Sequence, residues 1–339
     1  MKRGARARRL ETKPEFVHAQ MKSTLLSLLC FAGVGAAGLT TFAGPLKRAD
    51  IAAQAIWVVH VDCDILRPTT IGQYLLTELS KPEVQDKFAA FQSIFSFDPR
   101  KQLHGLTLYS SGSAPEDGVL LFYADFDPER LLTLAKAANG YESVPHGQHV
   151  IHNWIDDKKK AKDGVKPSVY AAIQGFRFII FGQRQVAVAK ALDVLDHTTP
   201  NLSTTKSFPE MGTPTDTSFL QAAANKLDLP GSDPNAAIFR LSKMVRLQIG
   251  EPQGRLTATL TLDANDEEVA GQMASVGQGL LALVKLQQDK SGAAKLAEGL
   301  SLEQKGSSVI TSFGLPAGDV VNFLKADAAK KAEKKAEKE

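Results

Sequence analysis

The alternation of apolar and polar residues predicts a chain that switches repeatedly between strands and helices. Residues 103–141 show this most clearly. Residues 106–110 alternate with period two, as in a strand with one buried face, and the apolar run 119–126 suits a strand covered on both faces. Asp127 and Pro128 then favour a helix start, because Asp can cap the first turn and Pro needs no amide hydrogen there. The stretch therefore predicts strand, turn, strand and helix.

The same reasoning extends over the rest of the chain. It predicts strands at 52–62, 148–156, 236–242 and 254–263, hairpins at 168–182 and 302–313, and helices at 69–79, 82–95, 183–195, 218–227, 266–288, 293–300 and 317–325. Hairpins mixed with helices indicate an α+β fold with largely antiparallel sheets and helices packed on one face.

A change in composition divides this chain. Residues 197–217 contain three Pro and many Ser and Thr, and so long a connection without structure marks a boundary. We therefore expect a first α+β lobe at 44–196, a linker at 197–217 and a second α+β lobe at 218–326. The tail, 327–339, is rich in Lys, Ala and Glu and has helix propensity without an apolar stripe.

The two predicted lobes share an order of elements. Residues 119–136 correspond to 255–273, since in both a strand leads to an acidic cap and a helix. Residues 177–192 correspond likewise to 308–326, where a strand ends at Gly and a helix follows. A diverged internal duplication is one hypothesis for this similarity, and it requires related strand orders in the two lobes.

The first 43 residues are predicted to be a leader and signal peptide rather than part of the fold. From Met21, a Lys precedes an apolar run that ends in a small-x-small sequence at Ala43, so we expect cleavage between Ala43 and Gly44. The run falls short of the roughly 20 residues of a membrane span. It stays open whether this segment is cleaved or retained as a membrane anchor. It also stays open whether translation starts at Met1 or at Met21.

Charge and cysteine content argue against two classes of function, nucleic-acid binding and cysteine catalysis. The leader holds seven of the 40 Lys and Arg residues and two of the 37 Asp and Glu residues, so residues 44–339 carry a net charge of −2. This argues against a nucleic-acid partner, which selects a basic face. Cys63 is the single cysteine after the leader, and we expect Asp62 and Asp64 to raise its pKa and suppress the reactive thiolate.

The candidate metal ligands are three closely spaced histidines, His146, His149 and His152. Two or three imidazoles can bind zinc or copper. On a strand, however, residues three apart point to opposite faces, so His149 and His152 are expected to diverge. No Cys or acidic third ligand is spaced as catalytic zinc sites require. We therefore expect histidines on a sheet edge, and no cofactor.

Four aspartates, Asp62, Asp64, Asp125 and Asp127, lie at predicted strand ends. Paired carboxylates could perform acid–base chemistry, although such residues more often cap helices. After the leader, the sequence contains no G-x-S-x-G, phosphate-binding loop, G-x-G-x-x-G or H-E-x-x-H motif. An enzyme is therefore not the preferred interpretation, and no catalytic residue is assigned.

Five segments in order resemble a known group of proteins: AIWVVHVD, HGLTLYSSG, VLLFYADFDPERLLTLAK, GQHVIHNWID and FIIFGQRQVAVAKALDVL. Together with the signal peptide they resemble uncharacterised exported proteins of planctomycete and verrucomicrobial bacteria, over about residues 55–195. The resemblance implies export in a bacterium with an outer membrane. It carries over no catalytic residue.

These observations predict an exported, periplasmic or extracellular, non-catalytic binding or envelope-associated protein. Its partner would be an envelope protein or a small ligand, with membrane contact only through the signal segment before cleavage. The alternative is a metal-dependent, hydrolase-type enzyme that uses His146–His152. A carrier of a small apolar ligand beneath the helix 266–288 is a third hypothesis, and it needs a deep apolar pocket.

Overall fold

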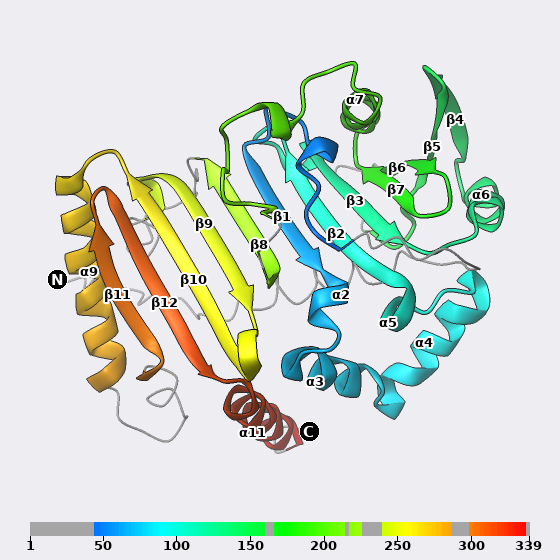
Figure 1. The fold of residues 1–339 in the computed structure, drawn as a ribbon. Coiled ribbons are helices and arrows are strands. Elements are labelled where there is room, and N and C mark those ends of the chain that lie inside the picture. Colours follow the sequence, from blue (N-terminus) through cyan, green and yellow to red (C-terminus); the bar gives the residue numbers. More distant parts are fainter. Residues whose placement is uncertain (1–43, 160–165, 214–216, 226–238, 287–297, 337–339) are drawn as a thin grey trace, which may run out of the picture.

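One antiparallel sheet of twelve strands runs through the whole computed structural model (Figure 1). The structure describes residues 44–159, 166–213, 217–225, 239–286 and 298–336. The strand order is β11-β12-β10-β9-β8-β1-β2-β3-β7-β6-β5-β4. The predicted α+β class with antiparallel pairing is therefore confirmed, and the two expected lobes share one continuous sheet.

The strands and helices have the following bounds. The strands are β1 (Trp57–Asp62), β2 (Leu103–Ser110), β3 (Gly118–Ala124), β4 (Glu142–His146), β5 (His149–Ile155), β6 (Ser168–Gln174), β7 (Phe178–Gly182), β8 (Ser218–Asn225), β9 (Ser242–Gly250), β10 (Arg255–Ala264), β11 (Leu300–Lys305) and β12 (Ser308–Pro316). The helices are α2 (Cys63–Leu66), α3 (Thr70–Leu79), α4 (Pro82–Phe95), α5 (Pro99–Gln102), α6 (Pro128–Lys136), α7 (Gln185–Leu195), α9 (Glu267–Leu286) and α11 (Ala317–Ala336), with short 3₁₀ helices η1 (Arg48–Asp50), η2 (Pro115–Asp117), η3 (Leu202–Thr204) and η4 (Pro252–Gly254).

Two apolar clusters cover opposite faces of the sheet in the first half of the chain. Leu121 of β3 packs in a cluster with Leu192 of α7, whereas its neighbour Phe122 packs in another with Phe91 of α4. Successive residues of a strand point to opposite faces, so β3 is buried on both sides, as its apolar run predicted. Helices therefore cover both faces of this half, where the sequence predicted one face.

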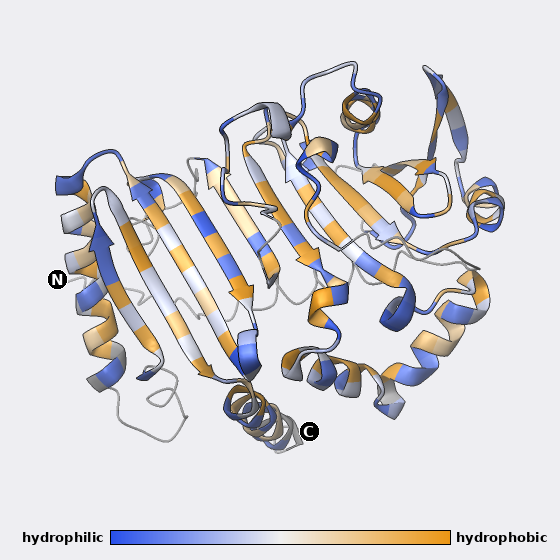
Figure 2. Ribbon diagram, viewed as in Figure 1, coloured by the Kyte–Doolittle hydropathy of each residue, from blue (hydrophilic) through white to orange (hydrophobic). Residues whose placement is uncertain are grey.

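The second half is a one-sided sheet. Along β10, Leu260 and Leu262 belong to a cluster with Met273 of α9, while Thr259 and Thr261 point to the other face. The period-two alternation predicted for 254–263 is thus confirmed. Figure 2 shows the same alternation of apolar and polar residues along β9, β10 and β12.

The two halves have the same strand order, read outward from their shared centre. In the first half the order is β1, β2, β3 and then β7, the last strand of its hairpins; in the second half it is β8, β9, β10 and then β12. In both, a helix follows the third strand and another follows the last one. The related strand orders required by the duplication hypothesis are therefore present.

Two predicted elements near the start of the second half differ from the structure. Residues 218–227, predicted as a helix, begin with the strand β8, because pairing with β1 and β9 outweighs the helix propensity of its three alanines. Of the strand expected at 236–242, residues 236–238 lie outside the described part of the chain, 239–241 are not in a strand, and β9 begins at Ser242. The sequence also missed β4.

The described residues 197–213 of the predicted linker pack against the beginning of the folded chain. Leu202 and Phe208 are fully buried. The backbone N–H of Leu202 donates to the carbonyl of Ile51 over 2.7 Å, and the Arg48 guanidinium donates to the carbonyls of Leu202 and Ser207 over 2.9 and 2.8 Å. This segment is therefore part of the core where the two halves meet.

Other predictions fall outside the described part of the chain. The leader 1–43, including the Ala43 side of the expected cleavage site, lies there, as do 293–297 of a predicted short helix and 337–339 of the tail. Up to residue 336, the tail continues the last helix, α11. Within the described residues, no helix combines the length and apolar character needed to cross a membrane.

Candidate functional site

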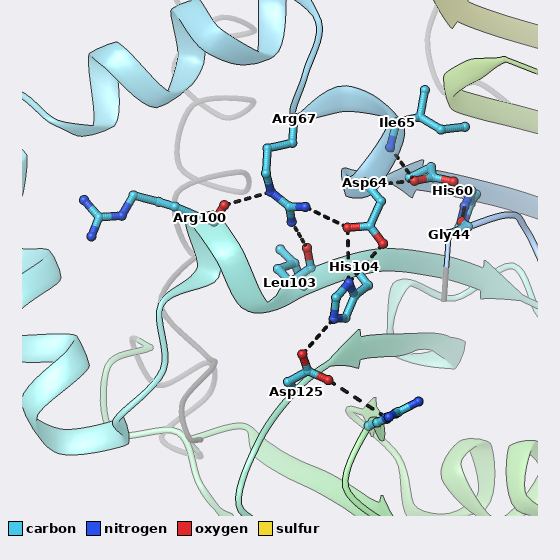
Figure 3. Close-up of polar contacts among 11 residues, drawn as sticks. Gly44, His60, Asp64, Ile65, Arg67, Arg100, Leu103, His104 and Asp125 are labelled. Atoms are coloured by element: carbon cyan, nitrogen blue, oxygen red, sulfur yellow. Dashed lines mark hydrogen bonds and ion pairs between the residues drawn. The ribbon is translucent and has the colours of Figure 1, made fainter. Parts of the chain in front are cut away.

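A histidine bridges two aspartates at one end of the sheet (Figure 3). His104 Nδ1 lies 3.0 Å from Asp64 Oδ2, and His104 Nε2 lies 3.1 Å from Asp125 Oδ2. Arg67 donates to Asp64 Oδ1 over 2.7 Å, and Arg177 Nε lies 4.0 Å from Asp125 Oδ1. The side chain of His104 is 21% exposed, so the cluster reaches the surface.

Strand register explains why these residues meet. Asp62, the last residue of β1, pairs with Gly105, so α2 and its Asp64 begin beside His104. In the next pair Leu103 lies opposite Ala124, which places Asp125 on the other side of the same histidine. The site therefore joins three segments that are far apart in the sequence.

Arg67 holds Asp64 in place by hydrogen bonds to backbone carbonyls near His104. Its Nε donates to the carbonyl of Arg100 over 2.8 Å, and its Nη2 donates to the carbonyl of Leu103 over 2.6 Å. These two bonds tie α2 to the start of β2 while Nη1 holds Asp64. The guanidinium uses its planar fork of donors on three acceptors at once.

The geometry of His104 suits a cross-link better than a catalyst. Carboxylates accept hydrogen bonds, so a ring N–H of His104 can donate to either aspartate, and each ring nitrogen faces a carboxylate oxygen. A general base or a metal ligand needs a ring nitrogen with a free lone pair. With both nitrogens engaged, His104 connects α2, β2 and the segment after β3.

The neighbouring residues have structural roles too. Asp62 and Asp127 cap α2 and α6, each accepting backbone N–H bonds on one carboxylate oxygen. Cys63 is a free thiol, and burial raises its pKa to about 12, with Asp62 and Asp64 adding to the effect. The predicted suppression of its thiolate is confirmed in direction.

The three candidate metal ligands do not converge. His146 and His149 face each other across the β4–β5 hairpin and contact successive turns of α7: His146 Nε2 lies 2.8 Å from Asp193 Oδ1, and His149 Nε2 lies 2.8 Å from Asp196 Oδ1. His152 points to the other face, as predicted, and its Nδ1 lies 3.0 Å from the Tyr141 hydroxyl.

The hairpin that carries these histidines lies at the edge of the sheet, where β4 is the terminal strand. Among the described residues, no group of three or more His, Cys, Asp or Glu side chains is arranged to hold a metal ion. The pairs with Asp193 and Asp196 instead fasten the hairpin to the C-terminal end of α7.

Sequence reasoning identified both carboxylates of the site but missed His104. Asp64 and Asp125 are candidates because they lie at predicted strand ends, whereas the alternation over residues 106–110 predicts a strand and gives His104 no role. The signal was available in principle: aligning the ends of β1 and β3 against the start of β2 would have placed a histidine between two aspartates.

No protein family and no curated protein matches this chain. Among solved structures, crystal form III of TP0453 is similar at 10% identity, covering 84% of this chain and 99% of that chain, with a TM-score of 0.44. Crystal form I of TP0453 gives 10% identity, 84% and 98% coverage and a TM-score of 0.42. We infer nothing about activity or partners from a similarity at this level.

Proposed function

We propose that this protein is an exported, non-catalytic binding protein that acts in the bacterial envelope. Its working surface would be the apolar face of the sheet beside α9, and its partner an envelope protein that presents an apolar segment to that face. The observation that carries the proposal is the large set of half-exposed apolar side chains on this one face.

The apolar face is continuous across the centre of the sheet. Leu247 of β9 lies opposite Leu260 on one side and Ala222 on the other, and Ala222 lies opposite Val59 of β1. Directly paired residues share a face, so these side chains form a row, and a second row runs parallel to it. The two rows comprise Leu106, Leu108, Val59, Val61, Leu220, Ala222, Leu247, Ile249, Ala258, Leu260, Leu302 and Phe313, all of them half-buried.

Helix α9 adds apolar residues along one flank. Val276, Leu280 and Leu283 follow one helical stripe and are 53%, 40% and 59% exposed. The opposite flank contacts the edge strand, since Gln304 of β11 donates to the carbonyl of Glu267. The stripe is therefore turned away from β11, toward the centre of the apolar face.

The shape of this face favours a macromolecule over a small ligand. A cavity away from this face, lined by Glu142, Val144, Ile151 and Tyr170, has a volume of about 60 Å³, against roughly 300 Å³ or more for a site that encloses a drug-sized molecule. The apolar residues beside α9 instead extend over several strands. A shallow apolar surface of this kind suits a protein segment.

Site-specific photo-crosslinking in intact envelopes tests the proposal. A photoreactive side chain at position 280 lies in the apolar stripe, while one at Gln278, exposed on the opposite side of the same helix, is the matched control. We expect a discrete protein adduct from position 280 and none from position 278. The substitution Leu247→Glu, in the same row but outside the cluster under α9, should remove the adduct if docking uses the sheet face. Equal adducts from both positions would contradict the proposal.

A further inference from the structure

We infer that Asp62 is a buried receptor for the α-ammonium group that signal cleavage creates on Gly44. This inference goes beyond the proposed function and depends on the predicted cleavage between Ala43 and Gly44, not on any partner. Its ligand is a primary ammonium ion, supplied by the chain itself.

The carboxylate of Asp62 is half satisfied. The residue is 1% exposed. Its Oδ1 accepts backbone N–H bonds from Asp64 and Ile65 over 3.0 and 2.9 Å, whereas its Oδ2 is buried and makes no hydrogen bond within the described part of the chain. A buried carboxylate oxygen without a donor is destabilising, because it has lost its hydrogen bonds to water and gained none in return.

Gly44 lies against that oxygen. The residue is buried, and its carbonyl accepts a hydrogen bond from His60 Nε2 over 3.1 Å, which fixes its position on β1. A Cβ placed on Gly44 would lie 2.9 Å from Asp62 Oδ2. That separation is too short for carbon but is the length of an N–H···O bond between an ammonium and a carboxylate, about 2.7–2.9 Å.

Cleavage lets a nitrogen occupy this position. Hydrolysis of the Ala43–Gly44 peptide bond consumes one water and leaves a carboxylate on Ala43 and an α-ammonium on Gly44. The new terminus is free to turn about its Cα–C bond, and because glycine has only hydrogens there, the nitrogen can take the place of one of them. The N–Cα bond is nearly as long as a Cα–Cβ bond, so the nitrogen would then lie close to 2.9 Å from Oδ2.

The residues that follow Gly44 are already fixed in position by contacts with the 202–212 region. Leu46 is buried, and its carbonyl lies 2.7 Å from where a Cβ on Gly212 would be, so the two backbones are in close contact. The guanidinium of Arg48 donates to four carbonyls of the 202–208 region. The ammonium would therefore be placed without ordering additional chain, which makes the ion pair less costly to form.

A pair of chains that differ by one native residue tests this inference. The 44–339 chain begins at Gly44, and the 43–339 chain begins at Ala43 and so has a peptide nitrogen in place of the ammonium. Both contain every described element. Each is compared with its Asp62→Asn variant, which keeps the Oδ1 cap of α2 and removes the charge. We expect the 44–339 chain to melt about 5 °C above the 43–339 chain, and this difference to vanish in the Asp62→Asn pair.

Two results would overturn the inference. One is a melting difference below about 1 °C between the two chains with Asp62 intact. The other is a difference of the same size with and without Asp62→Asn, since it would then come from something other than this ion pair. Amino-terminal sequencing of the exported protein is a further check, because a mature chain that begins elsewhere than Gly44 would also overturn it.

Discussion

Val59 of β1 lies directly opposite Ala222 of β8, and this pair joins the first half of the chain to the second. Equivalent strands of the two halves therefore meet antiparallel at the middle of the sheet, with Trp57 opposite Ala224 and Val61 opposite Leu220 on either side. The halves share backbone hydrogen bonds at this junction, so neither presents a complete sheet alone.

We predict that the described chain unfolds in one cooperative transition and that Ala222→Pro weakens both halves together. Proline removes a ladder hydrogen bond from a central strand and leaves its partner unsatisfied, at a cost of about 1–3 kcal/mol. Trp57 lies at the junction, opposite Ala224, whereas Trp154 lies in β5. Fluorescence in urea therefore reports on the first half alone when both proteins carry Trp57→Phe. An unchanged fluorescence midpoint in the variant would show that the halves are independent.

We predict that Asp64→Ala destabilises the fold more than Asp125→Ala does. Asp64 binds both His104 and Arg67 and is 21% exposed, whereas Asp125 is 47% exposed and therefore better screened by water. We expect losses of about 2 kcal/mol and below about 1 kcal/mol respectively. Urea denaturation measures both, and the reverse order would contradict a cross-link centred on Asp64.

We predict that Cys63 resists alkylation in the native protein. Burial raises its thiol pKa to about 12, so the thiolate is scarce at pH 8. Iodoacetamide should label the 44–339 chain rapidly in urea and at least about 100-fold more slowly without it. Mass spectrometry measures the modification, and comparable rates in the two conditions would refute this account of the site.

We predict that Asp196 contributes to the acid sensitivity of the β4–β5 hairpin. The hydrogen bond from His149 holds the pKa of this carboxyl below its usual value. A lowered folded-state pKa contributes stability that is complete above the unfolded pKa and is lost as pH falls through the folded one. Between about pH 5 and pH 3, Asp196→Asn should therefore lose less stability than the parent, whereas parallel pH curves would contradict this role.

We predict that zinc leaves the melting temperature unchanged. His146 and His149 are engaged with Asp193 and Asp196, and His152 points to the opposite face. Calorimetric melting with and without zinc, alongside elemental analysis, checks this. Near-stoichiometric zinc that is lost in the His149→Ala, His152→Ala variant would restore the metal-dependent alternative.

Most helices and strands could be predicted because residues within or next to each element determine where it starts and ends. Asp127 and Pro128 start α6, and Gly175, with φ of 61°, turns the β6–β7 hairpin. The strand β8 was missed because its alanines favour a helix when read alone, while two neighbouring strands decide its conformation. The residues of a strand do not by themselves specify which strands it pairs with.

The candidate site was harder to predict for the same reason. His104 lies between Asp64 and Asp125 only because three strand ends align, and register depends on pairing across the sheet. The divergence of His149 and His152 needed only the period of one strand and was predicted correctly.

Because β1 pairs with β8, the sheet has two edge strands, β4 and β11, whereas two separate sheets would have four. Neither edge strand is well suited to pairing with a strand of another chain. Pro145 in β4 lacks an N–H donor, and Glu303 and Lys305 in β11 are exposed charges. Proline and charge at a sheet margin oppose strand addition by a neighbouring molecule. A protein that offers an apolar face to a partner is in this way protected against polymerising through its own backbone.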